Sequence, residues 1–131
     1  MPANGSLLLD TNIVIALFSG DPKVGERFDS SAELYICVHV LGELRYGAVA
    51  SSRFRENLGR VEWFSARVPV LACDEQTVVH YANIRFGLRK KGRPIPENDL
   101  WIAAIARQHG LTLLSRDSHF RHIEGLQVET W

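Results

Sequence analysis

Acidic side chains occupy three points of this sequence at which an apolar strand is expected to end. Asp10 comes directly after three leucines, and Asp117 closes the apolar run 111–114. Glu43 falls in or near the first turn of the helix expected after the strand 34–40. Apolar runs without alternation suit strands of a parallel sheet, in which ligand sites gather at the carboxyl ends of the strands. We therefore expect these three carboxylates to share one sheet edge, although Asp10 alone could equally be a helix N-cap.

Asp99 is a fourth acidic candidate, in the first turn of an apolar helix that Pro96 can open. Spacing leaves open whether the connection 90–95 returns the chain to the same edge. Four neighbouring carboxylates repel one another and are tolerated chiefly when a cation neutralises them. Oxygen ligands without a consistent His or Cys component indicate Mg²⁺ or Mn²⁺ rather than zinc. Such an ion hydrolyses phosphodiester bonds by activating a water and stabilising the charged oxygens.

The elements that must position these acids alternate between strands and helices, which predicts the α/β class in one domain, 1–131. We expect strands at 7–9, 34–40, 68–73, 111–114 and 126–129, and helices at 12–19, 22–29, 40–49, 53–66, 75–89 and 96–109. Asp74 follows the third strand as Asp10 follows the first. Because Asp74 begins a long helix and has Glu75 beside it, we interpret it as a helix cap rather than a catalytic group.

Four motifs, in order and at suitable spacing, resemble the PIN-domain nucleases and, most closely, the VapC-like toxins of bacterial and archaeal toxin–antitoxin pairs. They are Asp10-Thr11-Asn12, Glu43-Leu44-Arg45, Pro96-Glu97-Asn98-Asp99 before Ile102-Ala103-Ala104, and Ser115-Arg116-Asp117-Ser118-His119-Phe120 before Gly125-Leu126. Each motif is weak alone, but four in register are specific. Asn12, where a second Asp would be needed, counts against the haloacid-dehalogenase phosphatases.

The resemblance implies a PIN-like three-layer α/β/α fold with a five-stranded parallel sheet, and it puts Asp99 into the site that spacing could not assign. It implies an Mg²⁺ site made by Asp10, Glu43, Asp99 and Asp117, with polar support from Thr11, Asn12, Asn98 and Ser115. It also implies endoribonuclease activity, a homodimer, and inhibition by a cognate antitoxin protein. A non-catalytic PIN-like scaffold that binds RNA or a protein through the same groove is the alternative, although such a scaffold would be expected to have lost some of the acids.

Positively charged side chains offer contacts for RNA phosphates. Five cations without an intervening acid end the helix 75–89 and follow it: Arg85, Arg89, Lys90, Lys91 and Arg93. They could hold phosphates or simply complement the helix dipole, and both interpretations stay open. Arg45 and Arg116 could contact phosphates or pair with neighbouring acids. We interpret His119 as a surface histidine rather than a general acid, and Tyr46 and Trp101 as core residues rather than base-stacking platforms.

Composition restricts these functions without assigning one. Fifteen basic and fifteen acidic residues give a formal net charge of zero, so that nucleic-acid binding must depend on a local patch. The N-terminus has no basic region, and no apolar run approaches the roughly 20 residues that span a bilayer, so we expect a cytoplasmic protein without a membrane segment. Cys37 and Cys73 lie in apolar runs and are expected to be reduced, buried thiols.

Overall fold

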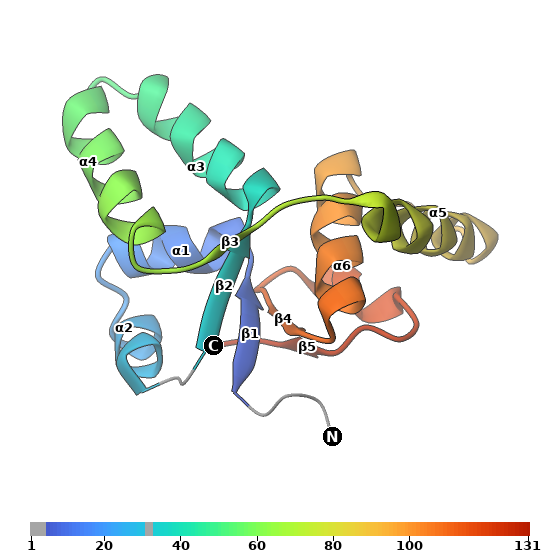
Figure 1. Ribbon diagram of the computed structural model, residues 1–131. Coiled ribbons are helices and arrows are strands. Elements are labelled where there is room, and N and C mark those ends of the chain that lie inside the picture. The colour runs from blue at the N-terminus through green and yellow to red at the C-terminus, as the bar shows by residue number, and fades with distance from the viewer. Residues whose placement is uncertain (1–4, 31–32) are drawn as a thin grey trace.

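Five parallel strands form one sheet in the computed structural model, which describes residues 5–30 and 33–131 (Figure 1). The strand order is β3-β2-β1-β4-β5. The strands are β1 (Ser6–Leu9), β2 (Glu33–Cys37), β3 (Val70–Leu71), β4 (Thr112–Leu114) and β5 (Val128–Glu129). The expected five-stranded parallel sheet is confirmed. The N-terminal residues 1–4, on which the expectation about export depends, lie outside the described residues.

Helices cover both faces of this sheet, which confirms the three-layer α/β/α architecture. In Figure 1, α1 (Thr11–Phe18), α2 (Pro22–Ser30) and α4 (Phe54–Ser65) lie to the left of the strands, and α5 (Glu75–Lys90) and α6 (Glu97–His109) to the right. The two remaining helices are α3 (Val38–Val49) and the 3₁₀ helix η1 (Ser118–His122). Among the described residues, no helix is both long and apolar enough to cross a membrane.

The central strands make the core, since every residue of β1 is buried and so are Leu113 and Leu114 of β4. Burial of each leucine stabilises the fold by roughly 1.5–3 kcal/mol. On one side the core continues into α6, where the run Ile102–Ala106 is completely buried. Gly110 ends α6 in the left-handed conformation, at φ 65°, as its position in the sequence predicts. These packed elements hold the carboxyl ends of β1 and β4 side by side.

The boundary between β2 and α3 differs from the prediction of a strand over 34–40. β2 ends at Cys37, and the next three residues already belong to α3. Val40, Leu44 and Ala48 recur at four-residue spacing and are buried together, so their packing outweighs the β preference of Val38 and Val40. As a result Glu43 lies in the second turn of its helix rather than in or near the first.

The third strand is also shorter than the predicted 68–73. Pro69, which has no backbone N–H, precedes β3, and only Val70 and Leu71 pair with β2. Cys73 consequently lies outside the strand and is exposed, so its predicted burial is wrong, whereas Cys37 is buried. Both cysteines are free, and burial raises the pKa of the Cys37 thiol to about 11, which keeps it protonated.

Candidate metal centre

Asp10 stands where β1 gives way to α1, and only 3% of its surface is exposed. It is the N-cap of α1, since its Oδ1 accepts the backbone N–H of Thr11 at 2.8 Å. Its Oδ2 accepts the Ser115 hydroxyl at 2.7 Å, and Ser115 itself follows β4. The cap interpretation of Asp10 is therefore correct, but it accounts for only one of the two carboxylate oxygens.

Asn12 joins the acids at the ends of β1 and β4. Its amide Nδ2 lies 3.4 Å from Asp10 Oδ2 and 3.5 Å from Asp117 Oδ2. Its Oδ1 accepts the backbone N–H of Arg116 at 3.2 Å, which fixes the amide in place. The backbone N–H of Asp117 donates to Ser115 Oγ at 3.0 Å. One amide and one hydroxyl thus hold two carboxylates beside each other.

Glu43 reaches this group from α3. The hydroxyl of Thr11 donates to Glu43 Oε1 at 2.8 Å, so that the first residue of α1 connects the glutamate to the end of β1. The backward lean of helical side chains brings Glu43 there from the second turn. This arrangement agrees with the expectation that Asp10, Glu43 and Asp117 lie at one edge of the sheet.

Asp99 arrives from the first turn of α6, beside His119 of η1. His119 Nε2 lies 3.0 Å from Asp99 Oδ2, and the two side chains are 33% and 16% exposed. The distance suits an ion pair, but the direction does not make a hydrogen bond, and Nε2 has no hydrogen-bond partner within the described part of the chain. One donor atom each from Asp99, Asp117 and His119 lie within 4.8 Å of one another. His119 is therefore a partly exposed residue of the connector, as expected, but its Nε2 atom is buried against Asp99.

The electrostatics of the group oppose full ionisation. Burial raises the pKa of Asp10, and nearby Asp117 and Glu43 add to the rise, against the hydrogen bonds from Ser115 and Thr11. Burial and the charge of Asp10 raise the pKa of Asp99 to about 6, with smaller increases from Glu43 and Asp117. His119 acts in the opposite sense. Asp74, the matched acid after β3, has a lowered pKa because backbone N–H groups of its helix donate to it.

Asp74 forms a capping box with Thr77 at the start of α5, which confirms its interpretation as a cap. Asn98 lies half-buried next to Asp99, but its side chain makes no hydrogen bond within residues 5–30 and 33–131. Among the predicted supporting residues, the structure thus joins Thr11, Asn12 and Ser115 to the acids and leaves Asn98 unconnected.

The raised pKa of Asp99 gives a pH-dependent prediction for the metal-free protein. A carboxyl that binds its proton more tightly in the folded state stabilises the fold at low pH, and this contribution is lost as pH rises through about 6. We expect metal-free Asp99→Asn to be more stable than wild type at pH 7.5 by on the order of 2 kcal/mol, since one pKa unit corresponds to about 1.4 kcal/mol. Urea unfolding in EDTA at several pH values measures the difference.

The difference between the two proteins should shrink toward zero below about pH 4, where Asp99 is protonated in both the folded and the unfolded states. Titrating groups far from Asp99 are shared by the two proteins and cancel, whereas Asp10, Glu43, Asp117 and His119 interact with Asp99 and contribute to the measured difference. An Asp99→Asn variant that is less stable than wild type at pH 7.5 would contradict the expectation that burial and neighbouring negative charges make ionised Asp99 destabilising.

The predicted RNA-contacting residues lie on several different surfaces. Arg45 pairs with Glu62 at 3.9 Å, and Arg116 pairs with Asp21 at 2.9 Å, so both engage acids outside the group of four. Arg85 pairs with Glu97 at 3.4 Å. The run of five cations does not form one surface: Arg85 and Arg89 line a recess with Pro94 and Ile95, whereas Lys90 and Lys91 line a different one.

Two aromatic residues differ from their predicted core positions. Tyr46 is 75% exposed on α3. Trp101 is half-buried and lies between two rings, parallel to His39 at 5.9 Å and to Tyr81 at 3.9 Å between centroids. No local signal in the sequence distinguishes His39 and Tyr81, because the stack is assembled from three separate helices, α3, α5 and α6.

A three-layer α/β/α domain with acids gathered at the carboxyl ends of its central parallel strands is the arrangement of a known class of metal-dependent nuclease folds. The chain belongs to the PIN domain family, whose sequence profile matches residues 7–126. Proteins of this family generally use divalent metal ions, and the acidic group described above could bind one. The resemblance drawn from the four sequence motifs is thereby confirmed.

Relatives and solved structures agree with this assignment. Ribonuclease VapC2 of Haemophilus influenzae is 35% identical over 127 residues, which cover 95% of this chain and 96% of the relative. The tRNA(fMet)-specific endonuclease VapC of Shigella flexneri is 36% identical over the same shares of the two chains, 95% and 96%. The DNA-bound VapBC structure from Salmonella typhimurium has a TM-score of 0.90 and 33% identity, covering 96% of this chain and 98% of that one.

Proposed function

We propose that this chain is an Mg²⁺-dependent endoribonuclease, able to use Mn²⁺, that acts as the toxin of a toxin–antitoxin pair. One observation carries the proposal: Asp10, Glu43 and Asp117 lie close enough to Asp99 to raise its pKa, around the ends of two adjacent strands. At neutral pH the ionised carboxylates of such a group repel one another strongly unless a cation binds among them. The names of the VapC relatives supply the substrate class, RNA, and the VapBC complexes supply the partner, an antitoxin.

The donor set fits a hard divalent cation. Asp99 and Asp117 offer carboxylate oxygens within 4.8 Å of each other, and Asp10 is held beside Asp117 by the shared Asn12 amide. Carboxylate oxygens are the ligands that Mg²⁺ and Mn²⁺ prefer. We therefore propose that Asp10, Glu43, Asp99 and Asp117 hold the ion. When bound, the ion supplies an activated water and charge stabilisation for phosphodiester hydrolysis.

The neighbouring polar residues keep the acids in position. Ser115 and the Thr11 N–H fix the two oxygens of Asp10, and the Thr11 hydroxyl fixes Glu43. Asn12 sets the separation of Asp10 and Asp117. His119 Nε2 is buried 3.0 Å from Asp99 Oδ2, so we propose that its ring positions the Asp99 carboxylate at the site. Asn98 adjoins Asp99 and is proposed to contact only the hydration of the site.

Sequencing of RNA 5′ ends after brief induction tests the function. Wild type is expected to produce discrete new ends in a small set of RNAs, and Asp10→Asn to produce none of them. The same comparison with purified proteins and total RNA, with and without EDTA, excludes host nucleases. Identical ends from the wild type and the variant, or no cleavage by purified wild type in Mg²⁺ or Mn²⁺, would contradict the proposal. The second result would favour a non-catalytic scaffold.

A further inference from the structure

Cations from two distant parts of the sequence meet beside η1. Lys90 ends α5, Lys91 and Arg93 follow it, and Arg121 lies in η1. All four are exposed, and we call them the cationic rim. The pKa of His122, which follows Arg121, is lowered by burial and then by the charges of Arg93, Lys91 and Arg121. The rim therefore concentrates positive charge in a chain whose formal net charge is zero.

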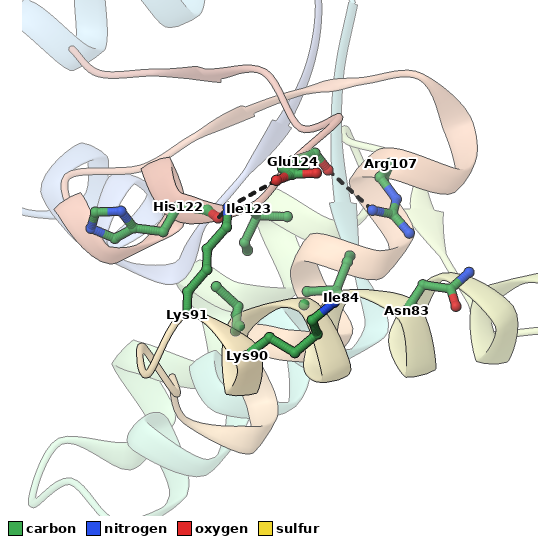
Figure 2. Close-up of a pocket in the computed structure, with 10 residues that line it drawn as sticks. Asn83, Ile84, Lys90, Lys91, Arg107, His122, Ile123 and Glu124 are labelled. Carbon is green, nitrogen blue, oxygen red and sulfur yellow. Dashed lines mark hydrogen bonds and ion pairs between the residues drawn. The ribbon is translucent and has the colours of Figure 1, made fainter.

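Lys91 holds the two parts of the rim together. Its Nζ donates to the backbone oxygen of His122 at 2.7 Å and pairs with Glu124 at 3.3 Å. Figure 2 shows Lys91 reaching from the end of α5 toward Glu124. Arg107 of α6 donates to the backbone oxygen of Glu124 at 3.1 Å and fixes the same loop from the other side. Lys91 and Arg107 thus hold the loop after η1 against α5 and α6.

The remaining rim cations are available to a ligand. In the described part of the chain, the ammonium group of Lys90 lies 5.5 Å from the centroid of the Phe86 ring and has no acid at ion-pair distance. Within residues 5–30 and 33–131, Arg93 and Arg121 have no acid at ion-pair distance. Beside them, α5, α6 and the segment after η1 enclose a recess of about 620 Å³, with Lys90 and Lys91 on its wall (Figure 2). Lys90 lines this recess, and with Arg93 and Arg121 it forms a group of exposed cations without acidic partners among the described residues, which suits a polyanion.

The rim is connected to the metal centre through η1. This helix starts directly after Asp117, contains His119 beside Asp99, and ends at His122. Five residues of 3₁₀ helix rise about 10 Å, so the rim begins roughly that far from the acids. Arg85 and Arg89, by contrast, line a separate recess with Pro94 and Ile95.

We propose that the cationic rim binds the phosphates of the RNA strand on one side of the scissile bond, an inference that rests on the proposed nuclease function. The rim touches no reacting atom. It holds the strand by charge, so its loss raises KM and leaves kcat nearly unchanged. Arg121 belongs to the contact surface, although it lies outside the basic run 85–93. Arg89 lies within that run but does not belong to the contact surface.

Binding of a fluorescein-labelled oligouridylate in EDTA over a salt series tests the assignment. The rim variant Lys90→Ala/Arg93→Ala/Arg121→Ala is compared with Lys23→Ala/Arg55→Ala/Arg89→Ala, which removes the same charge from exposed positions elsewhere. The rim variant should lower the log–log salt slope by about 2, at about 0.7 per lost contact, and weaken binding near 0.15 M salt by on the order of 50-fold. The control variant should match wild type.

Cleavage of total RNA by the same three proteins separates this inference from the proposed function. If wild type cleaves RNA normally and both triple variants bind the oligouridylate equally well, the inference about the rim is wrong and the proposed nuclease function stands. Wild type that neither binds the oligouridylate nor cleaves RNA would overturn both. A loss of affinity that appears with duplex DNA but not with RNA would also overturn the rim as an RNA surface. A rim variant that keeps kcat at saturating RNA with a raised KM supports it.

Discussion

Replacing Asp10 with Asn is expected to lower the Mg²⁺-supported rate of RNA cleavage by on the order of a thousandfold, because a metal ion contributes several kcal/mol of transition-state stabilisation and each 1.36 kcal/mol is about tenfold in rate. Asp10 is buried and fixed by Ser115 and Thr11, so the isosteric amide should leave the fold intact while removing a charged ligand oxygen. Initial rates on a sequence-mapped RNA site, with and without EDTA, measure the loss.

Metal binding itself gives a second readout in the same pair of proteins. A ligand that binds only the folded state stabilises it by about 2.7 kcal/mol at 100 times Kd, which corresponds to a Tm rise on the order of 10 °C for a chain of this size. Metal-free wild type should show such a rise with Mg²⁺ or Mn²⁺, and Asp10→Asn and Asp99→Asn should lose most of it. No rise in wild type under saturating metal would contradict the four-carboxylate site.

Asp74→Asn is the matched control for both measurements. Asp74 also stands after a strand of the sheet and caps a helix, but its charge is not among those that raise the pKa of Asp10 or Asp99. Asn is about as good an N-cap as Asp, so the variant should fold normally. It is expected to retain both the cleavage rate and the metal-dependent rise in Tm. If Asp74→Asn lost cleavage as Asp10→Asn does, the assignment of the acids would be wrong.

The contrast between Asp10 and Asp74 marks the limit of prediction from local sequence. Both follow apolar runs, and local chemistry makes both helix caps. What separates them is the neighbouring strand: β1 lies beside β4, whose end carries Ser115 and Asp117, whereas β3 is at the edge of the sheet. Strand order is a tertiary property, so the sequence around Asp10 leaves its role ambiguous until the other acids are considered.

The assignment of Asp99 to the acidic group could not be made from the spacing of the sequence. α5 ends at Lys90, Gly92 adopts the left-handed conformation at φ 68°, and the N–H of Arg93 bonds the oxygen of Leu88 at 2.9 Å. This turn directs the chain back, so that α6 begins beside the other acids. Glycine adopts this left-handed conformation without strain, but spacing does not show where the turn leads, so only the family resemblance could assign Asp99 in advance.

The basic run is the opposite case, in which the sequence does contain a usable signal. Arg85 and Arg89 are four residues apart and share one helix face. Because each residue of a helix turns the chain by about 100°, Lys90 and Lys91 point away from that face. Helical periodicity alone is therefore sufficient to divide the run between two faces. The addition of Arg121 could not be predicted this way, because the contact between α5 and η1 depends on Lys91 and the oxygen of His122.

The antitoxin is expected to inhibit through the same acids. A recess of about 320 Å³ runs between α1, α3 and α4, with Glu43 at its border and Ile15, Leu44 and Val61 on its walls. We expect the antitoxin's C-terminal segment to pack apolar side chains on this recess, lie across Glu43 and Asp99, and place an Arg or Lys among the carboxylates. An Arg could make two parallel hydrogen bonds to one carboxylate, and the apolar anchors would supply most of the affinity.

This arrangement makes metal and antitoxin competitors. Raising Mg²⁺ should weaken antitoxin binding, Glu43→Gln should weaken it further, and removing the antitoxin tail should restore cleavage while leaving the rest of the antitoxin folded. Titration calorimetry over an Mg²⁺ series, with wild type and Glu43→Gln, measures the first two effects. Tyr46→Ala is the matched control on α3, because Tyr46 is exposed and does not line the recess, and it should leave affinity unchanged. Affinity that is independent of both Mg²⁺ and Glu43, with cleavage still suppressed, would mean that inhibition acts away from the carboxylates.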